Sequence, residues 1–188
     1  MKIYDISQEL LSSVIYEGDQ APHLEKVKDY AQEGYILSNL KMCLHNGTHV
    51  DAPSHFNRLG ESIDKLPLDT FLGKCLVIEI NGLVTAEIIS ALPKGVERLL
   101  IKGKNTFTPS AAIEIEFTDI RLIGIENQSI GGKDFFHVHK LLSNKQIAVI
   151  EGLRLSGVSA GGYFLCALPL NIKGAEGSPC RAVLIEEK

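Results

Sequence analysis

Three histidines and one aspartate lie within a single segment of eleven residues: His45, His49, Asp51 and His55. Their numbers are all odd, so in an extended chain their side chains would point to the same side. A straight strand advances ~3.3 Å per residue and would hold His45 and His49 roughly 13 Å apart. Gly47 lies between them, at a point where the backbone can bend. We therefore predict a bent strand and loop in which His49 and Asp51 share a site.

Imidazole and carboxylate groups are the ligands expected for zinc, manganese or iron. The two oxygens of Asp51 could bridge two ions, and two ions ~3.5–4 Å apart form a hydrolytic centre that activates water. Three further residues could complete the site: Glu151 and Glu126, which each follow an apolar run, and His139. Taken alone, the two glutamates could equally be surface carboxylates at strand ends. His137 and His139 face different ways on a helix, so at most one of them could be a ligand.

Strands alternating with short helices must position these residues. Runs rich in Val, Ile and Leu predict buried strands at 75–80, 98–101, 121–125, 147–150 and 182–185. Helices are predicted after three N-cap residues, Thr85, Thr108 and Asp134, over 86–91, from 109 towards 116, and through the segment that carries His139. This alternation indicates one α/β domain over residues 1–188, with an antiparallel β portion near residues 35–42. The order of the strands does not follow from the pattern.

Composition excludes several classes of protein. The chain has 188 residues, 45% of them apolar and 22% charged, which rules out a disulfide miniprotein, a disordered tail and a fibre. A net charge of −4 argues against a nucleic-acid partner. The four cysteines form no CxxC pair and are expected to be reduced thiols of a cytoplasmic protein. We expect no membrane span, because apolar runs are short. The apolar segment 10–15 could be an interface or part of the core.

The segment around Gly47 carries a recognisable pattern. His45-x-Gly47-Thr48-His49-x-Asp51-x-Pro53-x-His55 resembles HxGTHxDxPxH, the signature of the metal-dependent cyclase-like hydrolase family, at all seven fixed positions. That family includes bacterial kynurenine formamidase (arylformamidase) and isatin hydrolase. Further similar segments extend along nearly the whole chain, at residues 4–7, 60–68, 124–129, 139–153 and 168–181.

The resemblance implies a fold, a metal site and an assembly. The fold would be a single swivelling β/β/α domain, in a homodimer or a higher homo-oligomer. Two divalent ions per subunit, zinc or manganese, would be held by His45, His49 and Asp51 at the first position and by Asp51, His139 and Glu151 at the second. His55 would be the catalytic acid/base.

The activity implied by the resemblance is metal-dependent hydrolysis of a small amide or cyclic amide. Arylformamidase, in tryptophan catabolism, converts N-formylkynurenine and water to kynurenine and formate. Departures from the family pattern at Glu17, Glu126 and Gly131 concern the choice of substrate and leave the metal ligands intact. Two alternatives stay open: a lactam or lactone hydrolase or a cyclase on the same metal site, and a non-catalytic metal-dependent binding protein. The presence of His55 argues against the second of these.

Overall fold

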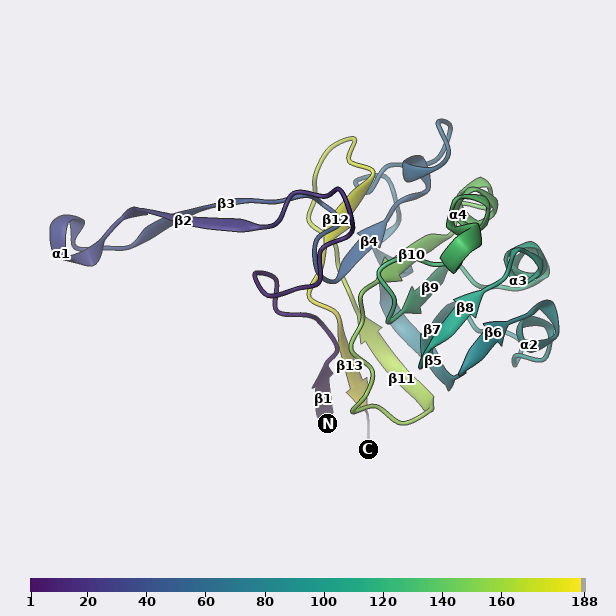
Figure 1. Ribbon diagram of the computed structural model, residues 1–188. Coiled ribbons are helices and arrows are strands. Elements are labelled where there is room, and N and C mark those ends of the chain that lie inside the picture. The colour runs from purple at the N-terminus through teal and green to yellow at the C-terminus, as the bar shows by residue number, and fades with distance from the viewer. Residues whose placement is uncertain (187–188) are drawn as a thin grey trace.

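A nine-stranded mixed sheet runs through the computed structural model, which describes residues 1–186 (Figure 1). Its strands, in spatial order, are β1 (Lys2–Asp5), β13 (Val183–Glu186), β11 (Gly161–Cys166), β5 (Leu72–Glu79), β7 (Arg98–Lys102), β9 (Leu122–Ile125), β10 (Ala148–Glu151), β4 (His49–Asp51) and β12 (Gly177–Pro179). Strands β5, β7, β9 and β10 pair in parallel, and all the other neighbours pair antiparallel. The sheet therefore has a parallel middle flanked by antiparallel strands.

Three helices lie together on one side of the parallel strands (Figure 1). They are α2 (Ala86–Ser90), α3 (Pro109–Glu114) and α4 (Phe135–Asn144), and each lies within a crossover connection between two neighbouring parallel strands. Their buried side chains, such as Val138 and Leu142 of α4, form one core cluster with Leu99 and Ile123 of the sheet. A two-stranded parallel sheet of β6 (Gly82–Val84) and β8 (Asn105–Phe107) extends this layer.

The opposite face of the sheet carries a second core cluster, which includes Val50, Leu100, Ile150 and Leu184. Adjacent residues of one strand thus serve the two clusters: Leu100 faces one and Leu99 the other. This explains why the predicted strands read as continuous apolar runs, because both faces are covered.

A long β-hairpin projects from the body on the side away from α2 and α3 (Figure 1). It consists of β2 (His23–Lys28), the short helix α1 (Tyr30–Glu33) and β3 (Leu37–Lys41), with β2 and β3 antiparallel. We call residues 23–41 the arm. The antiparallel β portion predicted near residues 35–42 corresponds to β3.

The five predicted strands correspond to β5, β7, β9, β10 and β13, and the three predicted helices to α2, α3 and α4. The cap at Thr108 is confirmed, since its hydroxyl accepts the Ala111 N–H. Helices α2 and α4 also begin after Thr85 and Asp134, as predicted, but neither of these side chains makes a capping hydrogen bond. The 3-10 turns are Pro53–His55, Leu68–Thr70, Ile115–Phe117 and Gly132–Asp134.

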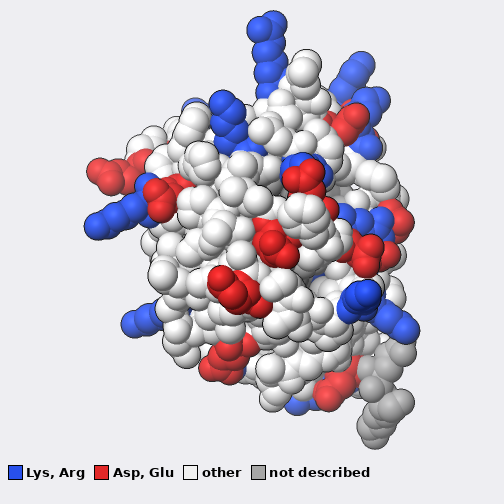
Figure 2. All heavy atoms as spheres, turned by 90° about the vertical axis from the view of Figure 1, so that its right-hand side faces the viewer, with Lys and Arg blue, Asp and Glu red and all other residues white. Residues whose placement is uncertain are grey.

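The surface over the helices carries lysine, arginine, aspartate and glutamate side chains interspersed, without a continuous area of one sign (Figure 2). None of the helices within residues 1–186 is both long and apolar enough to cross a membrane. The four cysteines are free thiols, and Cys75 is buried.

Candidate metal centre

Strand β4 places two of the predicted ligands. It lies between β10 and β12 and carries His49 and Asp51 on one face, with only 4% and 5% of their surfaces exposed. Gly47 precedes it with φ of +67°, a left-handed conformation that favours glycine. The bend predicted at Gly47 is therefore confirmed, and it returns the chain so that His45 lies over β4.

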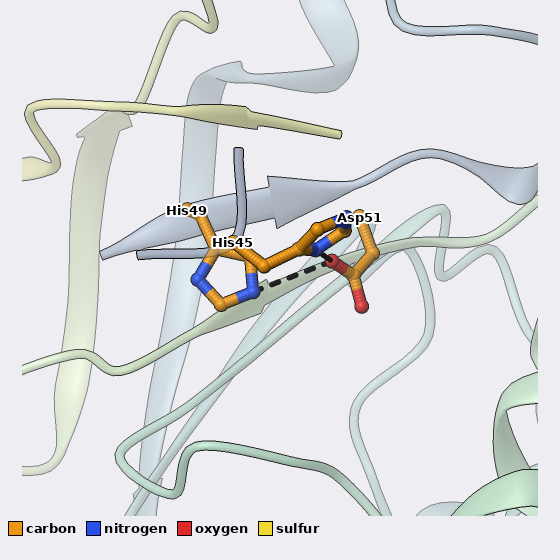
Figure 3. A group of neighbouring side chains, drawn as sticks. All are labelled: His45, His49 and Asp51. Carbon is orange, nitrogen blue, oxygen red and sulfur yellow. Dashed lines mark hydrogen bonds and ion pairs between the residues drawn. The ribbon is translucent and has the colours of Figure 1, made fainter. Parts of the chain in front are cut away.

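Two imidazole side chains converge on one carboxylate oxygen of Asp51 in the first cluster (Figure 3). Nδ1 of His45 lies 2.8 Å from Oδ1 of Asp51, and Nε2 of His49 lies 3.4 Å from the same oxygen. The two imidazole rings meet edge to face with centroids 5.1 Å apart. One ligand atom from each residue lies within 4.8 Å of the others, which is close enough for all three to bind one metal ion.

Asp51 also belongs to a second cluster, with His139 and Glu151. Glu151 ends β10, directly opposite His49 of β4, and is 3% exposed. His139 reaches the cluster from α4: its Nε2 lies 3.5 Å from Oε1 of Glu151, and its Nδ1 lies 3.8 Å from Oδ2 of Asp51. The two oxygens of Asp51 thus face different histidines, as a bridging carboxylate requires.

Burial and mutual repulsion shift the pKa values of the two carboxylates in the cluster. Burial opposes ionisation of Asp51, but hydrogen bonds to His45 and His49 outweigh it and hold the pKa of Asp51 below its ordinary value. Burial and repulsion by Asp51 raise the pKa of Glu151, although the Ile130 N–H donates to its Oε1 at 2.8 Å. Burial lowers the pKa of His139 to about 4. Imidazoles beside crowded, buried carboxylates form a donor set that fits divalent cations.

His55 lies beside this cluster on the turn that follows β4. Its ring stacks on that of His45, with centroids 4.3 Å apart and planes 25° apart. Partial desolvation, together with repulsion from His45, lowers the pKa of His55 against the attraction of Asp51. His55 is more exposed than the five proposed ligands, so its ring is open to a small molecule.

A cavity of about 180 Å³ opens onto the cluster. Besides the cluster itself and His55, it is lined by Tyr16, Asp19, Phe56, Gln128, Ser129 and Phe135. The ring of Phe56 stacks on His139, with centroids 4.3 Å apart. The cavity thus combines a polar floor with aromatic walls.

A larger hollow of about 390 Å³ lies elsewhere, between β5, β11 and the segment 95–98. Its buried cation, Arg98, donates to the carbonyl oxygens of Asp69, Thr70 and Lys74 and pairs with Glu97. The Arg98 guanidinium therefore has a structural role, because it links the backbone of the segment 69–74 to β7. The smaller cavity is the one whose lining can do chemistry.

One residue considered as a site candidate lies outside the cluster. Glu126 follows β9 as Glu151 follows β10, but its carboxylate accepts the backbone N–H groups of Gly103 at 2.7 Å and Leu155 at 2.8 Å. It serves a structural purpose there. His137 is exposed on α4, and only His139 of these two histidines reaches the cluster. This agrees with the prediction from their spacing that at most one of the two could be a ligand.

Two residues beside the cluster have no part in the sequence prediction. Oε1 of Glu176 lies 3.3 Å from Nε2 of His45, on the side of the ring away from Asp51. Oγ of Ser129 lies 3.2 Å from Nε2 of His139. Glu176 lies 131 residues from His45 along the chain, and Ser129 lies 10 residues from His139. Nothing in the local spacing of these residues indicates either contact. Carboxylate and hydroxyl partners of this kind orient imidazole ligands.

The chain is similar in sequence and in fold to several known proteins. Residues 4–99 match a family model described as "Putative cyclase". "Cyclase-like protein 1" of Oryza sativa subsp. japonica is 38% identical in an alignment of 179 positions that covers 81% of this chain and 65% of the rice protein. The chain thus spans 65% of the length of that relative.

A second relative covers the chain almost completely: the "Kynurenine formamidase" of Maricaulis maris (strain MCS10) is 31% identical, over 98% of each chain. A solved structure described as "The Structure Of Potential Metal-Dependent Hydrolase With Cyclase Activity" has the same fold, with a TM-score of 0.85 and 26% identity over 100% of this chain and 98% of that one. The α/β architecture expected from the sequence is therefore confirmed.

Proposed function

Because this chain belongs to the putative cyclase family, we propose that it is a metal-dependent hydrolase of a small amide or cyclic amide. One observation carries the proposal: three imidazoles and two buried carboxylates converge at the floor of a cavity, with Asp51 shared between two clusters. A likeness to a kynurenine formamidase supports the cleavage of a carbon–nitrogen bond.

Two divalent ions would be held by the residues of the two clusters. The first position would use His45, His49 and Asp51, and the second Asp51, His139 and Glu151. Divalent ions in such a site supply an activated water and polarise the carbonyl group of the substrate. Zinc and manganese both accept imidazole and carboxylate ligands, and the proposal includes either.

His55 would move the proton that amide cleavage requires. Its ring lies next to the cluster and faces the cavity. Its lowered pKa keeps the imidazole neutral near pH 7, so it can accept a proton and deliver it to the leaving nitrogen. A protein that only binds metal has no need of such a group, which favours catalysis over the non-catalytic alternative.

The cavity favours a small substrate with a flat apolar part. Phe56, Phe135 and Tyr16 form its walls, and a volume of about 180 Å³ suits a compact molecule. An N-formylated aromatic amine, such as N-formylkynurenine, combines a flat ring with an exposed formamide. We propose this class as the first substrate to test, with lactams and lactones as the alternatives on the same site.

The test is a substrate panel run on metal-depleted protein before and after zinc or manganese is restored. We expect hydrolysis of a formamide or lactam to appear with metal, and to be lost in Asp51→Asn. Asp69→Asn is the matched control, because that carboxylate is exposed and paired with Arg121. Hydrolysis that needs no metal, or an Asp51→Asn variant as active as the control, would contradict the proposal.

A further inference from the structure

His45 has a carboxylate oxygen beside each of its two ring nitrogens. Nδ1 lies 2.8 Å from Oδ1 of Asp51, a contact drawn in Figure 3, and Nε2 lies 3.3 Å from Oε1 of Glu176. The imidazole side chain is only 14% exposed, so both contacts are largely shielded from water. The orientation of this ring is therefore held from two sides.

The two carboxylates differ in their relation to the metal centre. Asp51 belongs to both clusters, and its Oδ1 also faces Nε2 of His49 at 3.4 Å. Glu176 belongs to neither of these clusters, and its side chain is 46% exposed. An ion shared by His45, His49 and Asp51 would lie on the Asp51 side of the His45 ring, which is the side of Nδ1.

The two contacts together select one tautomer of the His45 ring. An imidazole that binds a metal ion gives the lone pair of one nitrogen to the ion and keeps its proton on the other nitrogen. An ionised carboxylate can only accept a hydrogen bond. A proton on Nε2 is accepted by Glu176 and leaves the lone pair of Nδ1 directed towards Asp51. A proton on Nδ1 would instead block the ion and point the lone pair of Nε2 at a negative charge.

The backbone fixes the place of Glu176. This residue directly precedes β12, and its carbonyl oxygen accepts the Ala52 N–H at 2.8 Å. Strand β12 pairs with β4 in the register that sets Gly177 opposite Asp51. The ring of His45 packs against Gly177, where a Cβ would lie 2.7 Å from its Cε1. The pairing of β12 with β4 thus places both the carboxylate and the edge of the ring that it meets.

His49 is oriented in the same manner by a different acceptor. Its Nδ1 lies 3.1 Å from the carbonyl oxygen of Gly47, which can only accept a hydrogen bond, and its Nε2 faces Oδ1 of Asp51. His49 therefore presents Nε2, and His45 presents Nδ1, to the same position. A backbone carbonyl serves the histidine of β4, whereas the histidine on the preceding loop depends on a side chain.

We propose that Glu176 is a positioning residue of the metal centre: its carboxylate keeps the proton of His45 on Nε2 and so presents Nδ1 to the ion. The inference rests on the metal site of the proposed function and not on its substrate. It assigns the ligand atoms as well as the residues, because an ion at the first position would be bound by Nδ1 of His45 and Nε2 of His49.

Nuclear magnetic resonance of the zinc-loaded protein tests the assignment of ligand atoms. In protein labelled with ¹⁵N in its histidine rings, the nitrogen shifts and their couplings to ring protons show which nitrogen binds zinc and which carries a proton. We expect His45 to bind zinc through Nδ1 and to carry its proton on Nε2, and His49 to show the opposite arrangement. A spectrum of His45→Gln identifies the signals of that ring. Zinc on Nε2 of His45 would overturn the proposal.

The zinc affinity of three variants tests the role of the carboxylate. Metal-free Glu176→Ala, Glu176→Gln and Glu87→Ala are each titrated with zinc against a chromophoric chelator, with Glu87→Ala as the control because Glu87 is exposed on α2. We expect Glu176→Ala to bind zinc about 10- to 100-fold more weakly than the control, the usual effect of removing the partner of a ligand histidine. Glu176→Gln should recover most of the affinity, because its amide oxygen still accepts the Nε2–H of His45. An affinity of Glu176→Ala within twofold of the control, or an equal loss in Glu176→Gln, would overturn the proposal.

The failure of this proposal differs from the failure of the proposed function. A parent protein that binds no zinc would contradict the metal site itself, and the role of Glu176 with it. A parent protein that binds zinc through Nε2 of His45 would overturn only the role of Glu176. The measurement on the parent requires no variant to fold, and circular dichroism melting of the metal-free variants shows whether a loss of affinity arises from unfolding.

Discussion

Replacement of Gly177 by alanine tests whether the packing of His45 sets the geometry of the metal centre. Gly177 lies in β12, whose extended backbone tolerates any residue. A Cβ there would lie 2.7 Å from Cε1 and 3.1 Å from Nε2 of His45, and 3.0 Å from the Val50 carbonyl oxygen. Ordinary contact begins at 3.4 Å, so the ring would have to retreat by about 0.7 Å. We expect the ring to leave the position in which it faces Asp51.

The expected magnitude follows from the cost of overpacking, about 1–3 kcal/mol. If displacement of the ring relieves that strain, the cost falls on metal binding and corresponds to an affinity about 5- to 150-fold lower. Metal-free protein titrated with zinc against a chromophoric chelator measures this affinity. Gly157→Ala is the control, because a Cβ at that position meets nothing within 4 Å. Zinc affinity in Gly177→Ala within twofold of the control would refute the reasoning.

Three further experiments test the role of His55, the role of Glu126 and the burial of two cysteine thiols. His55→Ala should keep its metal, measured by elemental analysis, but lose about 10²- to 10⁴-fold in turnover; near-normal turnover would exclude His55 as acid/base. Glu126→Gln should lower the free energy of unfolding by about 1–3 kcal/mol, because two backbone N–H groups lose a charged acceptor, while the metal content stays unchanged; a loss of metal would return Glu126 to the site. Burial raises the thiol pKa of Cys75 and Cys180 to about 12, so at pH 8 only about one part in ten thousand is thiolate, and a disulfide reagent should modify them far more slowly in native protein than in urea; equal rates would show that these thiols are accessible.

The local part of the site could be predicted because it depends on neighbouring residues. Alternation along a strand puts His49 and Asp51 on one face, and the glycine at position 47 is free to take the left-handed conformation that the return of His45 requires. The strands of the parallel layer could be predicted for a similar reason: both of their faces are covered, so each reads as an unbroken apolar run.

Local sequence could not predict the long-range part, which came only from the family resemblance, because that part depends on strand order. Glu126 and Glu151 each follow a parallel strand, and local sequence does not distinguish them. Only the pairing of β10 with β4 puts Glu151 opposite His49, whereas Glu126 meets the backbone of Gly103 and Leu155. Glu176 reaches His45 from a loop 131 residues away, by the antiparallel pairing of β12 with β4.

The segment 10–15 shows a different kind of limit, because its apolar composition is the same whether it belongs to a core or to an interface. Leu11 and Val14 are exposed in the folded chain and lie in neither core cluster, so the core interpretation is wrong for them, and the interface stays a prediction.

Hydrolysis by this protein should depend on metal held by the cluster around Asp51. The most direct measurement is the rate of formamide hydrolysis by metal-depleted protein as zinc or manganese is added, with bound metal determined in the same samples. We predict that the rate rises from zero in step with metal bound to the parent, and that Asp51→Asn shows neither binding nor turnover. Full turnover in the metal-depleted protein, or bound metal without turnover of any formamide, lactam or lactone, would contradict the claim.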